Sequence, residues 1–301
     1  MSKEKISYGV VILNYNTSND AIKAAKTVIK CSTNNNFVIC ITDNASTKMG
    51  EIEALKNVNL RNTEVLAIKS NEGYARGNNE GCKYLINKYN PDYLVIMNPD
   101  VQLLNVGTIE RLIDNIDTKD YICGTQPLVW TPYKGNELYQ VNIRNVPSFF
   151  DVLIQHNFFL KRIFSRRAGK YIYKDQMPFI REIEYYVPSG AFFIMKAKQF
   201  ENLDFFDNDT FLYNEEVILG YKIKEKGYKM LFNPQEKVQH EGGKSIGSNS
   251  KRIKHYAVRF EKDSLDIYLT KYLKVGGFYK MLVHFVIDMD FFCKRISYFV
   301  R

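Results

Sequence analysis

Short apolar runs alternate with amphipathic segments over the first hundred residues. Residues 8–13 read Tyr-Gly-Val-Val-Ile-Leu, a continuous apolar run typical of a strand buried on both faces. Residues 18–31 instead place their apolar side chains at helical intervals. As the pattern continues, strands are expected at 8–13, 37–42, 63–68 and 93–97, and helices at 18–31, 52–55 and 77–89. This alternation predicts an α/β fold with a doubly wound, mostly parallel sheet and helices on both faces.

Polar side chains follow each expected strand. The four strand ends read Asn14-Tyr15-Asn16, Asp43-Asn44-Ala45-Ser46, Ser70-Asn71-Glu72-Gly73 and Asn98-Pro99-Asp100. These residue types also form ordinary turns, which is the plainer interpretation of any single one of them. Because ligands of parallel sheets bind at the carboxyl ends of the strands, four such ends together indicate a polar ligand site.

Glycines recur at every fourth position after the third expected strand. Gly73, Gly77 and Gly81 give the spacing G-x3-G-x3-G, which differs from the G-x-G-x-x-G of dinucleotide-binding folds. We expect a loop here that enters the helix at residue 77, with free backbone N–H groups and Arg76 facing an anion.

The composition is that of a globular protein and excludes disordered and low-complexity classes. Of the 301 residues, 45% are hydrophobic and 25% are charged, and the length suits one large α/β domain with appendages or two small domains. No run approaches the roughly 18 apolar residues of a membrane span, and no secretory leader precedes the first strand, so neither is expected. The cysteines are odd in number and lack CxxC spacing, so reduced core thiols are predicted at Cys31, Cys40, Cys82, Cys123 and Cys293.

The net charge of +9 is carried by two segments. Residues 251–301 hold 11 Lys and Arg against 5 Asp and Glu, and residues 151–181 hold 7 against 2. The rest of the chain is close to neutral. An anionic partner such as a nucleic acid, a membrane surface or a phosphorylated substrate is therefore expected at these two segments.

Six motifs occur in the order found in one enzyme family. The chain resembles the family 2 glycosyltransferases, inverting enzymes with a GT-A fold, and within them the bacterial rhamnosyltransferase-like branch. The resemblance covers roughly residues 6–245. Its motifs are Val11-Ile-Leu-Asn-Tyr-Asn16, Thr42-Asp-Asn-Ala-Ser46, Asn71-Glu-Gly-Tyr-Ala-Arg-Gly-Asn-Asn79, Met97-Asn-Pro-Asp100, Ser189-Gly-Ala191 and Phe211-Leu-Tyr-Asn-Glu-Glu216.

The resemblance implies a donor site for a pyrimidine nucleotide-sugar, either dTDP-rhamnose or a UDP-hexose. It places Asp43 on the pyrimidine N3–H and gives the remaining donor contacts to Asn14, Asn16, Asn71, Gly73, Arg76, Asn79 and Asn98. It also implies Mg²⁺ or Mn²⁺ on the diphosphate, held by Asp100, the last acid of a DxD motif, and by His240. Asn98 replaces the first acid of that motif, so a single carboxylate is expected on the metal.

The resemblance assigns the catalytic base to Glu216, which deprotonates the acceptor hydroxyl as it attacks the anomeric carbon. Glu215 and the loop Ser189, Gly190 and Ala191 are expected beside the acceptor. The plainer interpretation of both glutamates is that acids in a first helical turn complement the helix dipole. Ile218 stands where the family usually has a further Asp, which changes the expected acceptor contacts.

Aromatic and aliphatic side chains recur at helical spacing in both basic segments. Residues 278–299 predict an amphipathic helix with the stripe Phe278, Met281, Leu282, Phe285, Met289, Phe292, Ile296 and Phe299, and residues 151–167 show a similar mixture. An apolar face with basic flanks is typical of a helix in an anionic membrane interface, but packing on the core or on a partner subunit fits equally well.

We expect a GT-A domain at 1–250, followed by a basic helical tail at 251–301. Within this domain, residues 1–105 are expected to form a nucleotide-binding half and residues 106–250 an acceptor half. The acceptor half contains a basic insertion at about 150–181.

Together these features predict an inverting glycosyltransferase that extends a lipid-linked intermediate of a bacterial surface polysaccharide. It is expected in the cytoplasm, peripheral on the inner face of the plasma membrane, without a nucleic-acid partner and with a homo-oligomer left open. A sugar nucleotidyltransferase shares the fold class, but the chain lacks the early Gly-rich, Arg/Lys-containing signature expected of it. The alternative is a non-catalytic basic protein with a degenerate transferase fold that binds membranes or polyanions.

Overall fold

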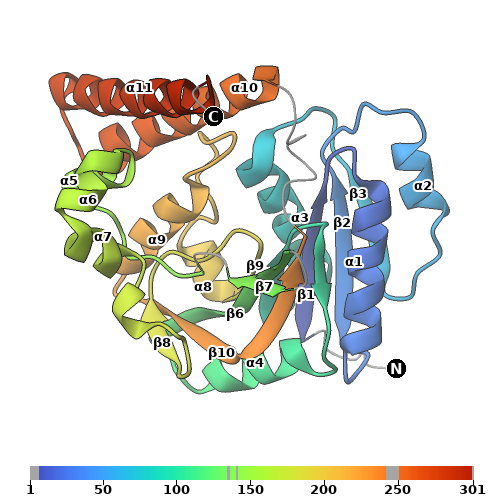
Figure 1. Cartoon of the computed structure of the whole chain (residues 1–301). Helices are drawn as coiled ribbons and strands as arrows, with labels where there is room; N and C mark the ends of the chain where they lie inside the picture. Colours follow the sequence, from blue (N-terminus) through green and yellow to red (C-terminus); the bar gives the residue numbers. More distant parts are fainter. Residues whose placement is uncertain (1–6, 134–135, 140–141, 242–250, 300–301) are drawn as a thin grey trace.

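A ten-stranded sheet lies at the centre of the computed structural model, which describes residues 7–133, 136–139, 142–241 and 251–299. The main path through the sheet runs β3-β2-β1-β4-β9-β6-β10-β5, with β7 on β6 and β8 on β10 (Figure 1). The strands are β1 Tyr8–Asn14, β2 Phe37–Asp43, β3 Thr63–Ala67, β4 Tyr93–Met97, β5 Val101–Leu103, β6 Ile122–Tyr133, β7 Asn136–Tyr139, β8 Ile183–Tyr185, β9 Phe192–Lys196 and β10 Lys229–His240.

Helices connect these strands and form the C-terminal end of the chain. The α-helices are α1 Ser18–Cys31, α2 Glu51–Asn57, α3 Gly73–Tyr89, α4 Thr108–Asp117, α5 Phe149–Gln155, α6 Phe158–Ile163, α7 Ser165–Tyr171, α8 Ala197–Asn202, α9 Glu215–Glu225, α10 Lys251–Ile267 and α11 Gly277–Phe299. A 3₁₀ turn, η1, covers Lys174–Gln176, and a π-helical turn, η2, covers Tyr268–Tyr272 and links α10 to α11.

The strands β3, β2, β1 and β4 form the parallel half of the sheet. β1 and β2 pair in register from Tyr8 opposite Phe37 to Asn14 opposite Asp43, so the two strands end side by side. Helix α1 buries the side chains of Ala21, Ala24, Ala25 and Val28, small residues that let the helix lie close to the sheet. All four strands expected from the apolar runs are present.

The second half of the sheet mixes strand directions. β9 runs antiparallel between β4 and β6, and β6 pairs in parallel with the long strand β10. The last residue of β10, His240, lies opposite Val101, the first residue of β5. This pairing brings a residue from late in the chain back to the edge where β4 ends.

The expectation that residues 71–77 form a loop is wrong, because α3 already begins at Gly73. A Cβ on Gly77 would lie 2.5 Å from Leu13 Cδ1, and one on Gly81 would lie 2.5 Å from Thr42 Oγ1. Glycines spaced four residues apart share one helix face. Here that face packs against β1 and β2, so Gly77 and Gly81 serve helix packing and not anion binding.

The two basic segments share a hydrophobic cluster with α9. In Figure 1, α10 and α11 lie together along one side of the molecule, next to α5 and α6. Residues 151–167 form parts of three short helices, α5 to α7, because α5 ends at Gln155 and α6 at Ile163. The cluster contains Val152 and Leu153 of α5, Val217 and Ile218 of α9, Leu265 of α10, Tyr268 and Leu269 of η2, and Val283, Val286 and Ile287 of α11.

Helix α11 is present where it was expected but packs through a different face. Among the described side chains of this helix, the buried ones are Val283, Val286 and Ile287, which lie outside the predicted stripe. Of the stripe, Phe278 is 73% exposed, Met281 69% and Phe285 62%, while the side chains of Phe292, Ile296 and Phe299 lie outside the described residues. Within the described residues, no helix is long and apolar enough to cross a membrane. The helix therefore has a packed apolar face and a second, exposed one.

The Arg111–Glu236 ion pair joins α4 to β10 and provides a test of the fold. Glu236 is 8% exposed and accepts hydrogen bonds from Arg111 Nε at 2.5 Å, Arg111 Nη2 at 2.8 Å and Thr108 Oγ1 at 3.0 Å. Arg111→Met leaves this buried carboxylate without its cation and should lower the free energy of unfolding by about 2 kcal/mol. Urea denaturation measures the change.

The matched control is Lys83→Met, which removes one partner of an exposed pair with Glu80 at 3.8 Å and should change stability by less than about 0.5 kcal/mol. Equal effects of the two substitutions would contradict a structural role for the Arg111–Glu236 pair.

Candidate active site

The ends of β1 and β2 are joined by their own side chains. Asn14 Nδ2 donates to Asp43 Oδ1 at 2.8 Å, and Asp43 also accepts from Ser46 Oγ at 2.6 Å and Ser46 N at 3.1 Å. Asn14 and Asp43 are both buried. A carboxylate offers about four acceptor positions, so one remains at Asp43 Oδ2 for a further donor. The structure thus brings the predicted nucleoside residues Asn14 and Asp43 together.

Asn44 connects this pair to the start of α3, and its role was not predicted from the sequence. Its Nδ2 donates to Asn71 Oδ1 at 3.1 Å and to the carbonyl of Gly73 at 3.0 Å. Gly73 has a φ of +83°, and a Cβ there would lie 2.3 Å from the carbonyl oxygen of Phe211. Only glycine fits this close approach, so the position requires Gly73 for packing as well as for its left-handed backbone.

Three predicted donor residues are engaged elsewhere. Asn16 Oδ1 accepts from the backbone N–H groups of residues 47 and 48 in the loop after β2. Arg76 pairs with Glu72 at 3.1 Å and donates from Nε to the carbonyl of Asn208. Asn79 is buried and bonds the backbone of Phe206 and the side chain of Asn208. Arg76 and Asn79 therefore hold the 205–210 segment on α3, and their donor contacts stay predictions.

The predicted metal residues meet at the β4–β5 turn. Asp100 Oδ1 lies 3.1 Å from His240 Nε2, and the two side chains are 4% and 14% exposed. Asn98 precedes Asp100 by two residues and donates its backbone N–H to the carbonyl of Ala191. No group of three or more His, Cys, Asp or Glu side chains suited to a metal occurs in the described part of the chain. Residues 242–245, which follow Glu241 in the sequence, lie outside the described residues.

Glu216 lies against the loop that was expected beside the acceptor. A Cβ on Gly190 would come within 1.8 Å of Glu216 Oε1, so the carboxylate occupies the space above this glycine. Tyr74 of α3 donates its hydroxyl to the carbonyl of Gly190 at 2.6 Å. Ser189 is fixed from the other side, because its N–H donates to Gln126 Oε1 at 2.8 Å. The structure therefore places Glu216 together with Ser189, Gly190 and Ala191.

The two glutamates of α9 are neighbours of like charge, Glu215 buried and Glu216 half-buried. Burial raises the pKa of Glu215 well above its ordinary value, and the neighbouring charge of Glu216 adds to the shift. Glu215 is 3% exposed, and its Oε2 has no hydrogen-bond partner. Burial also raises the pKa of Glu216, although less, because the positive charge of Arg144 opposes the shift. A carboxylate with a raised pKa is a stronger base than an ordinary one.

Arg144 is a second residue that the sequence did not reveal. Its backbone exchanges hydrogen bonds with Val187, N to O at 3.2 Å and O to N at 3.1 Å, and its Nη2 donates to the carbonyl of Pro188 at 3.1 Å. These contacts hold the guanidinium near Glu216 and next to the loop that leads to Gly190. No local sequence motif marks Arg144, which lies in a short non-helical stretch between β7 and α5.

Helix α10 secures the turn that leads into α9. Ser264 donates to the carbonyl of Leu212, and the ring of Phe260 lies 4.7 Å from that of Phe211, centroid to centroid. The predicted tail thus supports the site, although the boundary at residue 250 is not itself tested.

Comparison with known proteins agrees with this geometry. Residues 9–219 match the model of the family described as Glycosyl transferase family 2. The chain belongs to glycosyl transferase family 2. Rhamnosyltransferase WbbL of Escherichia coli (strain K12) is 23% identical over 165 residues, which are 54% of this chain and 58% of that protein. The match therefore spans little more than half of the length of that relative.

Solved glycosyltransferase structures share the fold. GalNAc-T7 with UDP, GalNAc and Mn²⁺ superposes with a TM-score of 0.56 at 19% identity, covering 79% of this chain and 44% of that one. The mannosyltransferase PcManGT from Pyrobaculum calidifontis, in complex with GDP-Man and Mn²⁺, gives a TM-score of 0.57 at 12% identity and covers 96% of this chain and 74% of that one. The predicted GT-A fold class and family are confirmed, and the prediction of a transferase is confirmed at the level of the family. The roles of individual residues stay predictions.

The buried carboxyl group of Glu215 should make the free energy of unfolding depend on pH. Because the pKa of Glu215 is higher in the folded than in the unfolded chain, the folded chain binds more protons between the two pKa values, and stability falls as pH rises through that window. Glu215→Gln removes this loss. From pH 5 to pH 8 the unfolding free energy of the variant, relative to the wild type, should therefore rise by at least about 1 kcal/mol, measured by urea denaturation.

Glu225→Gln, an exposed substitution at the other end of α9, is the control and should leave the pH profile unchanged. A Glu215→Gln profile parallel to that of the wild type would show that Glu215 ionises as an ordinary carboxyl group.

Proposed function

We propose that this protein is an inverting glycosyltransferase that moves a sugar from a pyrimidine nucleotide to an acceptor hydroxyl. The observation that carries the proposal is the placement of Glu216: a half-buried carboxylate of raised pKa lies on Gly190, and the hydrogen bonds of Asn44 to Gly73 and of Tyr74 to Gly190 connect this loop to the strand end that holds Asp43. Asp43, the proposed nucleoside contact, and Glu216, the proposed base, thus belong to one connected arrangement.

The donor side is best satisfied by a uracil or thymine nucleotide. The remaining acceptor position of Asp43 suits the N3–H of these two bases, and cytosine has no N–H at this position. The similarity to a rhamnosyltransferase favours dTDP-rhamnose, and the structural similarity to a protein solved with UDP favours a UDP-hexose as the second choice.

Asp100 and His240 fit a divalent cation on the donor diphosphate. One carboxylate and one imidazole leave most coordination positions to phosphate oxygens and water, as is usual for Mg²⁺ or Mn²⁺ in nucleotide enzymes. The imidazole nitrogen favours Mn²⁺ over the harder Mg²⁺. When bound, the ion would neutralise the diphosphate and the charge left on the departing nucleotide.

Glu216 has the properties of the general base. Its carboxylate takes the proton of the acceptor hydroxyl while the hydroxyl oxygen attacks the anomeric carbon from the face opposite the nucleotide. Burial raises the pKa of Glu216, which strengthens the base, while Arg144 limits the rise so that the group stays ionised at a lower pH than burial alone would allow. Glu215, Ser189 and Ala191 border the space that the acceptor would fill.

The acceptor is proposed to be a lipid-linked glycan at an anionic membrane surface. The exposed face of α11 and the exposed side chains of α6 support this, because Phe158, Phe159 and Ile163 are 63%, 62% and 70% exposed. Phe149 of α5 contacts Tyr279 of α11, so the two basic segments are adjacent. A large exposed apolar patch with basic flanks is typical of a membrane-binding surface. A cytoplasmic location at the inner face of the plasma membrane follows from this proposal.

Glu216→Gln tests the catalytic assignment. The amide keeps the shape of the side chain but accepts no proton, so transfer should fall by about a hundredfold or more while the affinity for UDP or dTDP stays within twofold. Transfer is measured by release of the nucleotide, and affinity by calorimetry. Glu225→Gln is the control on the same helix.

Full activity of Glu216→Gln would remove Glu216 from the role of base. A wild-type protein that neither binds nucleotide nor transfers sugar would favour the non-catalytic alternative.

Replacing Phe278, Met281 and Phe285 by Ser tests the membrane proposal. Loss of three exposed apolar side chains should weaken binding to phosphatidylglycerol vesicles at least about tenfold and leave nucleotide affinity unchanged, as measured by vesicle co-sedimentation. The control replaces Met49, Leu104 and Val106 by Ser, three exposed apolar residues outside these segments. Unchanged vesicle binding by the α11 variant would favour a partner subunit on this face.

A further inference from the structure

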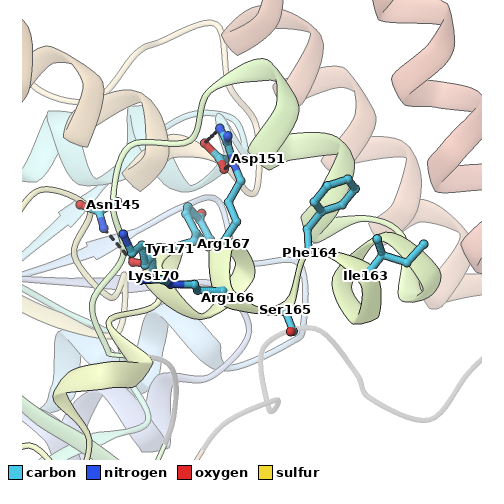
Figure 2. Close-up of a pocket in the computed structure, with 9 residues that line it drawn as sticks. All are labelled: Asn145, Asp151, Ile163, Phe164, Ser165, Arg166, Arg167, Lys170 and Tyr171. Atoms are coloured by element: carbon cyan, nitrogen blue, oxygen red, sulfur yellow. Dashed lines mark hydrogen bonds and ion pairs between the residues drawn. The ribbon is translucent and has the colours of Figure 1, made fainter.

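A pocket of about 780 Å³ lies between α5, α6 and α7, outside the site described so far (Figure 2). Its lining includes Asn145 and Tyr171 at one end and, at the other, Ile163 at the end of α6 and Phe164, which follows it. Two cations, Arg166 and Lys170, lie between these ends on α7. None of the predicted donor, metal or catalytic residues lines it.

The pocket has excess positive charge. Its acid, Asp151, is already neutralised, because Arg167 Nε and Nη2 bond its two oxygens at 2.6 and 3.2 Å. Burial alone would raise the pKa of Asp151, but the hydrogen bonds from Arg167 and Ser148 outweigh it and lower the pKa. Within the residues that the structure describes, Arg166 and the ammonium group of Lys170 have no acidic partner. Two cations in one concave pocket attract an anion of at least two charges.

The far end of the pocket is apolar and exposed. Ile163 is 70% exposed and Phe164 37%, and the exposed rings of Phe158 and Phe159 begin the same short helix. Apolar side chains around a cationic pocket favour a ligand that joins an anionic group to a hydrocarbon chain.

The end of the pocket that Asn145 and Tyr171 line is connected to Arg144 and Glu216, the proposed base. Asn145 holds α7 in place, because it donates from Nδ2 to the carbonyl of Lys170 and from its backbone N–H to the carbonyl of Tyr171. Tyr171 is a pocket residue whose hydroxyl also interacts with Arg144, and the charge of Glu216 reaches it as well. Arg144 in turn holds the Val187–Pro188 backbone next to Gly190, on which Glu216 lies. Tyr171 and Arg144 therefore connect the pocket to the loop on which Glu216 lies.

We propose that Arg166 and Lys170 bind the phosphate or diphosphate group of a lipid-linked acceptor, with its hydrocarbon chain leaving over Ile163 and Phe164. The proposal rests on the proposed glycosyl transfer to a lipid-linked acceptor and adds the residues that bind the anionic group of that acceptor. The pocket fixes the anionic group while the sugar end of the acceptor extends past Tyr171 toward Glu216.

Calorimetric titration with farnesyl diphosphate tests this assignment on the full chain. The wild type should bind it, and the double variant Arg166→Gln, Lys170→Gln should bind it at least about tenfold more weakly, because charge-assisted hydrogen bonds are lost. Both side chains are exposed, so the variant is expected to fold. Arg162→Gln removes one exposed charge outside the pocket lining and should bind the probe like the wild type. Farnesol, which lacks the diphosphate, should bind wild type and double variant equally weakly.

Two outcomes would overturn the assignment. Equal affinity of wild type and double variant for farnesyl diphosphate would show that the cations do not hold the anion. Loss of binding to phosphatidylglycerol vesicles in the double variant, with no binding of monomeric farnesyl diphosphate by the wild type, would make the pocket a general headgroup site of the membrane. Titration of UDP and dTDP in the same samples distinguishes failure of the pocket assignment from failure of the proposed function. Nucleotide binding without binding of farnesyl diphosphate refutes the pocket assignment alone. Absence of nucleotide binding refutes the proposed transfer.

Discussion

The in-register pairing of β1 with β2 is the constraint on which the site depends. It places Asn14 opposite Asp43 and lets the two side chains bond. From the same strand end, Asn44 holds the start of α3, and the next residue along α3, Tyr74, donates to the carbonyl of Gly190 beneath Glu216. A shift of β2 by one residue would turn Asp43 to the opposite face of the sheet and break this chain at its first bond. The sheet register therefore contributes to the position of Glu216, the proposed base.

The candidate site contains two neighbouring carboxyl groups in surroundings where a protein rarely places unpaired charge. Glu215 is buried and its neighbour Glu216 is half-buried, and within the described residues one carboxylate oxygen of Glu215 has no hydrogen-bond partner. Such an arrangement costs folding free energy and persists because the surrounding structure fixes it. Helix α10 takes part in that support through the 211–214 turn, so the basic C-terminal segment stabilises the site as well as carrying the exposed face of α11.

Local sequence pattern predicted what depends on local physics. The four apolar runs became strands, and helix α11 formed where the apolar spacing placed it, because burial and periodicity determine these elements. The same spacing did not reveal the second apolar face of α11, Val283, Val286 and Ile287, because that face is selected by packing against α5 and α9. Gly77 and Gly81 looked like an anion-binding loop because only the folded sheet shows what they contact. Arg144 had no signal at all, because its proximity to Glu216 arises from long-range pairing with Val187.

The most direct test of the central claim is calorimetric titration of the wild-type protein with UDP, dTDP, CDP and GDP, with and without Mn²⁺. If Asp43 accepts the N3–H of the base and Asp100 with His240 supports an ion on the diphosphate, UDP or dTDP binds at least about tenfold more tightly than CDP, and Mn²⁺ strengthens that binding. Equal affinity for all four nucleotides, or no binding of any of them, would contradict a pyrimidine nucleotide-sugar site at the ends of β1 and β2.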